Sequence, residues 1–173
     1  MKQEFTAVYE VFTDNSLWGG HIKVPLKYIK PFIDEGRNKK RVICCLSNTE
    51  CIHAALMSDG AGGFFIMINK ELKKKLDLSE GSKLTVSLEE DTSKYGIPMP
   101  EEMQELMGQD SEGDHYFHAL TRGKQRSLLY LIGKPKTSGT RLKKALVIIN
   151  YLKGTKGKLD FKELNQAMKN SSY

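Results

Sequence analysis

The sequence predicts an α+β protein: a small closed β-barrel made of two similar halves, followed by a C-terminal helical segment. Three observations predict this class. Residues 64–91 have the pattern of a strand, a short helix, a glycine turn and a second strand. A fainter copy of the same order lies 44 residues earlier. Residues 114–173 instead carry helical periodicity, with capping residues between apolar stripes.

The stretch 64–91 shows the clearer pattern of the two. It opens with five successive apolar residues, as in a strand that is buried on both faces. Asn69 can cap the short helix that follows, in which Leu72 and Leu76 share one face. Gly81 supplies a turn, and the residues after it alternate between apolar and polar. That alternation is typical of a half-buried strand.

The earlier copy covers residues 21–46. With the 44-residue shift, Val24 falls opposite Ile68 and Val42 falls opposite Val86. Two copies of one unit indicate that each buries its apolar face on the other. Chance agreement between apolar positions is the alternative.

These residues carry a resemblance to known families. The segment IMINKELKKKLDLSEGSKLTVSL resembles the pattern of swapped-hairpin, AbrB-like double-split β-barrels, with Ser82 where that pattern usually has Asp. The span from FTAVYEVF to YGIPMPEEM is similar to an uncharacterised barrel family in which one chain carries both barrel halves. The tail resembles the helical segment called bacteriocin-protection, YdeI or OmpD-associated, through FHAL (117–120), IGKPKTSGTR (132–141) and LKG (152–154). Neither family implies an established activity.

The net charge of +6 is distributed unevenly along the chain. Residues 1–109 hold 14 Lys/Arg against 16 Asp/Glu, whereas residues 110–173 hold 13 against 5. We therefore expect two domains, 1–109 and 110–173, with their boundary in the glycine-bearing stretch Gly108–Gly113. A basic tail favours nucleic acid or another acidic macromolecule as partner. Solvated helix faces are the alternative.

The basic residues of the tail are the first candidate site. If several lie on one face, they would neutralise backbone phosphates without reading a base sequence. The candidates are Arg122, Lys124, Arg126, Lys134, Lys136, Arg141, Lys143 and Lys144. The AbrB-like resemblance implies DNA binding, and the near-neutral barrel argues against it.

A second, weaker candidate is a ligand site at Trp18 and at the glycines Gly60, Gly62 and Gly63. An indole can stack on a ligand, and consecutive glycine amides can form an anion-binding nest. The alternatives are a tryptophan that covers the end of the barrel and a hairpin turn with glycines at positive φ.

Cysteines and histidines predict neither a metal site nor a disulfide. The three cysteines, Cys44, Cys45 and Cys51, have no CxxC spacing, and we expect reduced thiols. Cys51 and His53 share a strand face, and His115 and His118 are three apart on a helix, but each pair lacks a third ligand. We expect no metal and no cofactor, and packing or surface roles for the two helical histidines.

Capping residues divide the tail into helices. Asp114, Thr121 and Thr140 can each begin one, and Asp160 with Glu163 forms a capping-box pair for the last. The helix after Thr140 has an apolar stripe that we expect to be buried. Its members are Leu142, Ala145, Leu146, Ile149 and Leu152.

The function that these features favour is a non-catalytic binding module, with nucleic acid as the first partner considered. The alternative is a protein- or small-ligand-binding module in bacterial stress or antimicrobial-peptide resistance, as the tail's resemblance implies. No nucleophile–base pair, metal triad or paired carboxylate has a recognisable spacing, so an enzyme with a long-range constellation is the third possibility. Apolar runs far shorter than the ~18–20 residues of a membrane span favour a cytoplasmic protein. The oligomeric state stays open.

Overall fold

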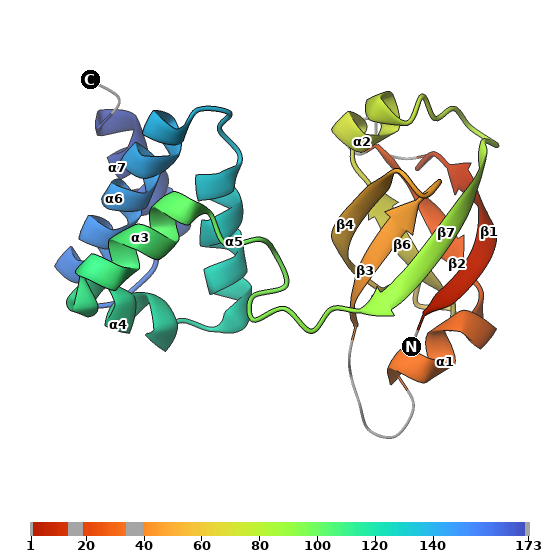
Figure 1. Cartoon of the computed structure of the whole chain (residues 1–173), viewed down its shortest axis with the longest axis horizontal. Helices are drawn as coiled ribbons and strands as arrows, with labels where there is room; N and C mark the ends of the chain where they lie inside the picture. The colour runs from red at the N-terminus through yellow and green to blue at the C-terminus, as the bar shows by residue number, and fades with distance from the viewer. Residues whose placement is uncertain (1, 14–18, 34–39, 172–173) are drawn as a thin grey trace. The chain divides into compact units, whose positions relative to one another are not determined.

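A computed structural model describes residues 2–13, 19–33 and 40–171 and divides the chain into two compact units (Figure 1). Residues 1–92 form the barrel unit and residues 93–173 the helical unit. The predicted α+β class, a barrel followed by helices, is confirmed. The division lies earlier than the expected boundary at Gly108–Gly113, because that stretch is helical on both sides of Asp110.

Seven antiparallel strands and two helices form the described part of the barrel unit. They are β1 (Gln3–Glu10), β2 (Gly20–Val24), α1 (Leu26–Ile33), β3 (Arg41–Leu46), β4 (Glu50–Ala55), β5 (Met57–Ser58), β6 (Phe64–Ile68), α2 (Lys70–Lys75) and β7 (Lys83–Glu90). The strand order is β4-β3-β7-β1-β2-β6-β5. Only Leu56 separates β4 from β5 in the chain, so the two ends of the sheet meet and the barrel is nearly closed.

Strand pairing confirms the repeat that the sequence predicts. Ile22 pairs with Ile66 in β2 and β6, and Cys44 pairs with Leu88 in β3 and β7. Both pairs are 44 residues apart, so corresponding strands of the two halves pair with each other about an approximate twofold axis. The remaining strands follow the same relation. In the first half β1 pairs with β7 and β2, and in the second half β4 and β5 take the place of β1, with β4 paired to β3 and β5 paired to β6.

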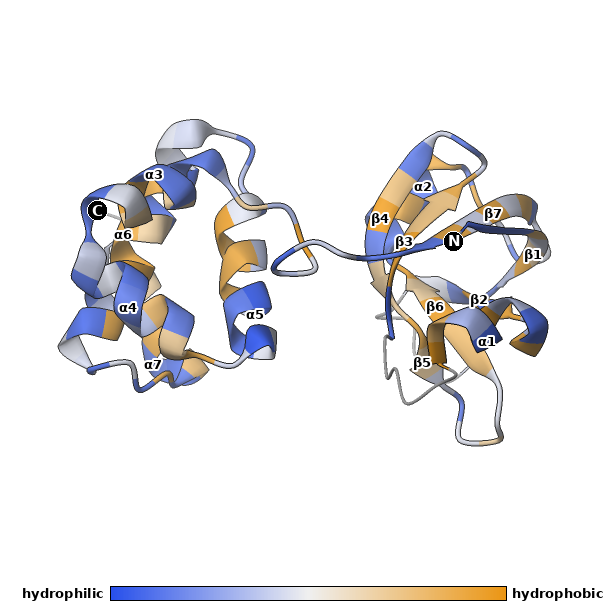
Figure 2. Cartoon of the chain, turned by 60° about the horizontal axis from the view of Figure 1, so that its bottom comes forward, coloured by the Kyte–Doolittle hydropathy of each residue, from blue (hydrophilic) through white to orange (hydrophobic). Residues whose placement is uncertain are grey.

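One core fills the barrel. The residues aligned by the repeat, Val24 with Ile68 and Val42 with Val86, are all buried in it. Strand β3 shows how the sequence achieves this, because alternate residues along it are buried. Figure 2 shows that many positions on the barrel strands are hydrophobic.

The helical unit contains five helices in its described part. They are α3 (Glu101–Gln109), α4 (Ser111–Ala119), α5 (Arg122–Gly133), α6 (Ser138–Gly154) and α7 (Phe161–Asn170). Thr121 and Asp160 cap α5 and α7 as predicted. The predictions for α4 and α6 were wrong by about one turn, because Asp110 and Thr137 reach the amides of Gly113 and Thr140 and so begin these helices earlier.

Helix α6 lies at the centre of the helical unit and packs against α3, α4, α5 and α7. Its buried residues are Ala145, Ile148, Ile149 and Leu152. Leu142 and Leu146 belonged to the stripe predicted to be buried, and that part of the prediction was wrong. Leu142 is 42% exposed and Leu146 is 39% exposed, because the face of α6 that packs against the neighbouring helices is rotated away from them.

Candidate binding surface of the helical unit

Two of the predicted phosphate-binding residues secure the start of the helical unit. The guanidinium groups of Arg122 and Arg126, both on α5, donate to the carbonyls of Lys94 and Tyr95. These contacts fix the segment that precedes α3. The side chains of Arg122 and Arg126 therefore stabilise the helical unit, and their guanidinium groups are already engaged by backbone carbonyls.

Two further candidates make internal contacts. Arg141 donates from Nε and Nη2 to the carboxylate of Glu102 at 2.7–3.0 Å, and its Nη1 donates to the carbonyl of Lys136 at 3.0 Å. The hydrogen bonds from Arg141 lower the pKa of Glu102 to about 2. Lys144 reaches the carbonyl of Leu131 at 3.4 Å.

The other four candidates, Lys124, Lys134, Lys136 and Lys143, are exposed. They come from α5, from the turn after it and from α6. The eight residues are therefore not a single set of solvent-facing cations.

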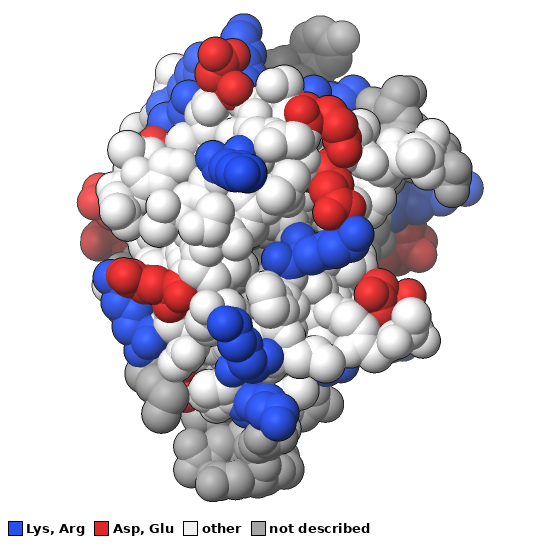
Figure 3. All heavy atoms as spheres, turned by 90° about the vertical axis from the view of Figure 1, so that its right-hand side faces the viewer, with Lys and Arg blue, Asp and Glu red and all other residues white. Residues whose placement is uncertain are grey.

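Acidic residues are concentrated on α3 and α4. Residues 95–121 contain six Asp/Glu and no Lys or Arg, although the helical unit as a whole holds 14 Lys/Arg against 8 Asp/Glu. On the barrel face seen in Figure 3, by contrast, the two signs of charge are interspersed. A stretch of one sign creates a local field that attracts partners of the opposite sign.

A groove of about 530 Å³ lies between α3 and α6, and we call it the α3–α6 groove. Its lining residues are Glu101, Glu102, Glu105, Leu106, Gln109, Ser138 and Leu142. Leu146 lies one helical turn beyond Leu142 on the same side of α6, so the exposed leucines form an apolar ridge. The groove thus combines the apolar side chains of Leu106 and Leu142 with the acidic side chains of Glu101 and Glu105, whereas the carboxylate of Glu102 is already paired with Arg141.

This groove was not predicted from the sequence. Leu142 and Leu146 were expected in a buried stripe, and the expected boundary at Gly108–Gly113 divided the acidic residues of α3 from those of α4. The signal that could have found the acidic wall is the run 95–121, which lacks any Lys or Arg.

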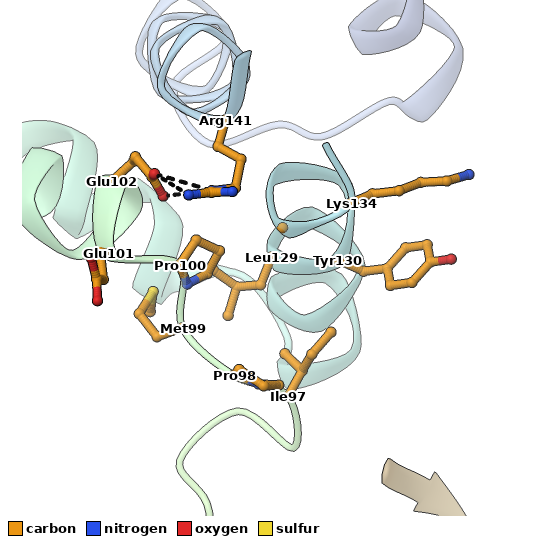
Figure 4. A pocket seen from close by; sticks show the side chains of 11 residues that line it. Ile97, Pro98, Met99, Pro100, Glu101, Glu102, Leu129, Tyr130, Lys134 and Arg141 are labelled. Carbon is orange, nitrogen blue, oxygen red and sulfur yellow. Dashed lines mark hydrogen bonds and ion pairs between the residues drawn. The ribbon is translucent and has the colours of Figure 1, made fainter. Parts of the chain in front are cut away.

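A cleft of about 500 Å³ adjoins the groove (Figure 4). The Glu102–Arg141 pair lies at its edge, and Glu102 lines both hollows. Apolar residues of the segment before α3 and of α5 line the cleft: Ile97, Pro98, Met99, Pro100 and Leu129. Tyr130 and Lys134 extend from α5 in Figure 4, and Tyr130 is 54% exposed.

A hydrogen-bonded chain of Tyr95, His118 and Asp114 is a further polar feature. The Tyr95 hydroxyl lies 2.8 Å from Nε2 of His118, and Nδ1 of His118 lies 3.0 Å from the backbone carbonyl oxygen of Asp114 and 3.0 Å from a carboxylate oxygen of the same residue. Tyr95 is nearly buried against the same core as Phe117. The chain ties the segment before α3 to α4, in agreement with the packing role expected for His118.

The weaker ligand site is not supported by the glycine loop. Gly60, Gly62 and Gly63 lie in the turn between β5 and β6, with Gly60 and Gly62 at φ of 80° and 90°. The Asp59 carboxylate accepts the amides of Ala61 and Gly63, each at 2.8 Å. A carboxylate therefore occupies the position that a bound anion would need, and the loop is the hairpin turn of the alternative interpretation. Trp18 lies outside the described residues.

The pair considered for a metal is engaged elsewhere. Cys51 is joined to Cys45, and Nδ1 of His53 lies 2.8 Å from the Asp91 carboxylate. Across residues 2–13, 19–33 and 40–171, no group of three or more His, Cys, Asp or Glu has a geometry that could hold a metal ion. None of the helices in these ranges is long and apolar enough to cross a membrane.

The fold and the groove define a two-unit protein with a candidate binding surface on its helices. Two family models match separate parts of the chain. Residues 5–88 match the model of a domain of unknown function, DUF1905, and residues 97–154 match the model described as bacteriocin-protection, YdeI or OmpD-associated. The second match contains every residue that lines the groove and the cleft. A comparison with curated proteins finds no match. The finer resemblance to AbrB-like barrels remains a prediction.

Proposed function

We propose that the chain is a non-catalytic binding module whose α3–α6 groove binds a cationic, amphipathic peptide. The observation that carries the proposal is a groove lined both by the exposed Leu142 and by glutamates of α3, with the exposed Leu146 one helical turn further along α6, beside the groove. Cationic amphipathic helices carry Lys/Arg on one face and Leu or aromatic residues on the other, which is the complementary arrangement. Binding in a groove through the apolar face of such a helix is a common mode of peptide recognition.

The family match agrees with this occupant. The matched residues 97–154 contain the whole groove, and the matching family is described as bacteriocin-protection, YdeI or OmpD-associated. Capturing a cationic bacterial peptide would protect a cell from it. We place the role of this chain in such protection.

Nucleic acid is the less favoured partner. Half of the predicted phosphate-binding residues hold the helical unit together, and the groove presents carboxylates, which repel phosphates. Because four of the predicted lysines are exposed, the experiment below also includes a nucleic-acid probe.

The test measures binding of three probes to the full chain by fluorescence anisotropy. The first is a synthetic amphipathic helix of Leu and Lys, about 14 residues long. The second is the same peptide with Glu in place of Lys, and the third is a DNA duplex. We expect binding of the Leu/Lys peptide alone, with an affinity that falls as salt is added. Equal binding of the Leu/Glu peptide, or binding of the duplex at ~50 mM salt without the peptide, would overturn the proposal.

Variants locate the site. Leu142→Ser and Leu146→Ser should each weaken the Leu/Lys peptide about tenfold, because each removes roughly 1–2 kcal/mol of apolar contact. Glu105→Lys should weaken it through like-charge repulsion. The matched controls are Phe161→Ser on α7 and Glu71→Lys on α2, which change an exposed apolar and an exposed acidic residue away from the groove.

A further inference from the structure

A disulfide joins Cys45 and Cys51 across the hairpin of β3 and β4. The expectation of three reduced thiols was therefore wrong for two of them. Cys44 and Cys45 do point to opposite faces of β3, as predicted, but the antiparallel register places Cys51 directly opposite Cys45. We propose that Cys45 and Cys51 form a reversible thiol–disulfide site that exchanges with low-molecular-weight disulfides of the glutathione class.

The fold separates the three cysteines into a reactive pair and a spectator. Cys51 is exposed and Cys45 half-buried on the outer face of the barrel, so a small disulfide can reach them. Cys44 is fully buried in the core, and burial raises the pKa of its thiol to about 12. The Cys44 sulfur is thus neither accessible nor ionised under ordinary conditions.

The hairpin can persist with the bond open or closed. Residues 41–46 pair with residues 50–55 at six successive positions, and β3 also pairs with β7. The bond spans a sequence separation of only 6, so it removes less entropy from the unfolded chain than a bond that closes a long loop. We therefore expect these strand ladders to hold the hairpin when the bond is open, which reversible exchange requires.

The bond lies at the seam of the barrel. Strand β4 is one end of the strand order, and its ladder in the described sheet is with β3. Oxidation fixes this end strand to β3 by a covalent bond, and reduction leaves it held by hydrogen bonds and packing. Hydrogen exchange of the β4 amides should therefore be faster in the reduced protein.

The exchange balances in two steps. The Cys51 thiolate attacks one sulfur of the small disulfide RS–SR, forming a mixed disulfide and releasing RS⁻. The Cys45 thiolate then attacks the Cys51 sulfur, closing the internal disulfide and releasing the second RS⁻. Two protein thiols are oxidised, one small disulfide is reduced to two thiols, and the two cysteine protons end on the released thiols.

The test equilibrates the full chain in mixtures of reduced and oxidised glutathione. Thiols are then alkylated in denaturant and counted by mass spectrometry, with circular dichroism as the check on folding. We expect one cooperative transition from three alkylated thiols to one, with Cys44 as the remaining site. Three thiols at every ratio, or an internal disulfide that excess reduced glutathione leaves intact in the folded protein, would overturn the proposal.

Single substitutions assign the transition. Cys44→Ala should leave it unchanged, since Cys44 is the spectator. Cys45→Ser should abolish the internal disulfide and leave Cys51 as a stable mixed disulfide with glutathione. A transition that survives in Cys45→Ser but is lost in Cys44→Ala would assign the bond to another pair and contradict the proposal.

Discussion

Single polar contacts join segments of the helical unit that are far apart in the chain. The Arg141–Glu102 pair connects the start of α6 to α3, and Lys153 binds Asp110 at 2.9 Å near the other end of α6. Asp110 also caps α4. Because each acid is held by a hydrogen-bonded cation, its pKa lies below the ordinary value.

The Glu102 shift predicts how acid affects stability. A carboxyl whose folded pKa is lowered contributes stability that is complete above its unfolded pKa of about 4.5 and is lost as the pH falls toward about 2. Arg141→Met should return Glu102 toward its ordinary pKa and so reduce the loss of stability over this pH range. Thermal unfolding followed from pH 7 to about 2.5, together with an NMR titration of the Glu102 carboxyl, measures both effects. Lys169→Met, an exposed change on α7, is the control; the same acid dependence in all three proteins would contradict the argument.

At Gly113 the constraint is steric: the neighbouring side chain leaves no room for a larger residue. It is buried on α4, and an added Cβ would meet Cγ2 of Ile149 well inside van der Waals distance. Gly113→Ala should therefore destabilise the protein by about 1–3 kcal/mol in urea denaturation. Ile149→Ala removes that methyl group, so the double variant should be more stable than the sum of the two single changes predicts. Gly108→Ala on α3, where a Cβ meets nothing, is the matched control and should stabilise by roughly 0.5–1 kcal/mol.

Helices and strands follow local patterns, but the choice of buried face depends on partners that a local pattern does not identify. Around α6, apolar residues cover more than one face, so the sequence predicts an amphipathic helix without deciding whether Leu146 or Ile148 faces the core. The contacts with α3, α4, α5 and α7 decide it. The strand–helix–strand repeat was predictable because both copies lie in the same chain and their apolar positions can be compared directly.

The Cys45–Cys51 bond could have been predicted from the sequence. A hairpin centred on Asn48 places residues at equal distances on either side of it opposite each other, and Cys45 and Cys51 are each three residues from Asn48. Alternation along β3 places Cys44 and Cys45 on opposite faces, but it does not identify their neighbours on β4. The register across the turn supplied the missing partner.

Helix α6 provides a direct test of which face is buried. Ile148→Ala should lower the free energy of unfolding by about 2–5 kcal/mol, because the side chain is fully buried. Leu146→Ala should cost less than about 1 kcal/mol, because Leu146 is exposed in the ridge beside the groove. Urea denaturation of the two variants compares residues two positions apart on one helix. Equal losses would mean that Leu146 is covered in the folded protein.

Over the whole chain, charge and core are both divided between the units. Residues 1–92 hold 13 Lys/Arg and 13 Asp/Glu, so the net charge of +6 belongs entirely to residues 93–173. Within that basic unit, the stretch 95–121 is strongly acidic. A basic unit with one acidic wall explains why net charge alone favoured nucleic acid and why the groove favours a cationic peptide.

Each unit has a hydrophobic core of its own, and among the described residues none belongs to both cores. Fragments 1–92 and 93–173, cut at the boundary between the compact units, should therefore each fold. The amide NMR spectrum of each fragment should show the chemical-shift dispersion of a folded domain. Since every residue of the α3–α6 groove lies in 93–173, that fragment should bind the Leu/Lys peptide as tightly as the full chain does, and 1–92 should not bind it. A pair of fragments cut instead at 109/110 should lose helical order, because it separates α3 from α6 and breaks the Glu102–Arg141 pair. If the 109/110 fragments fold and the 92/93 fragments do not, the division of the chain described here is wrong.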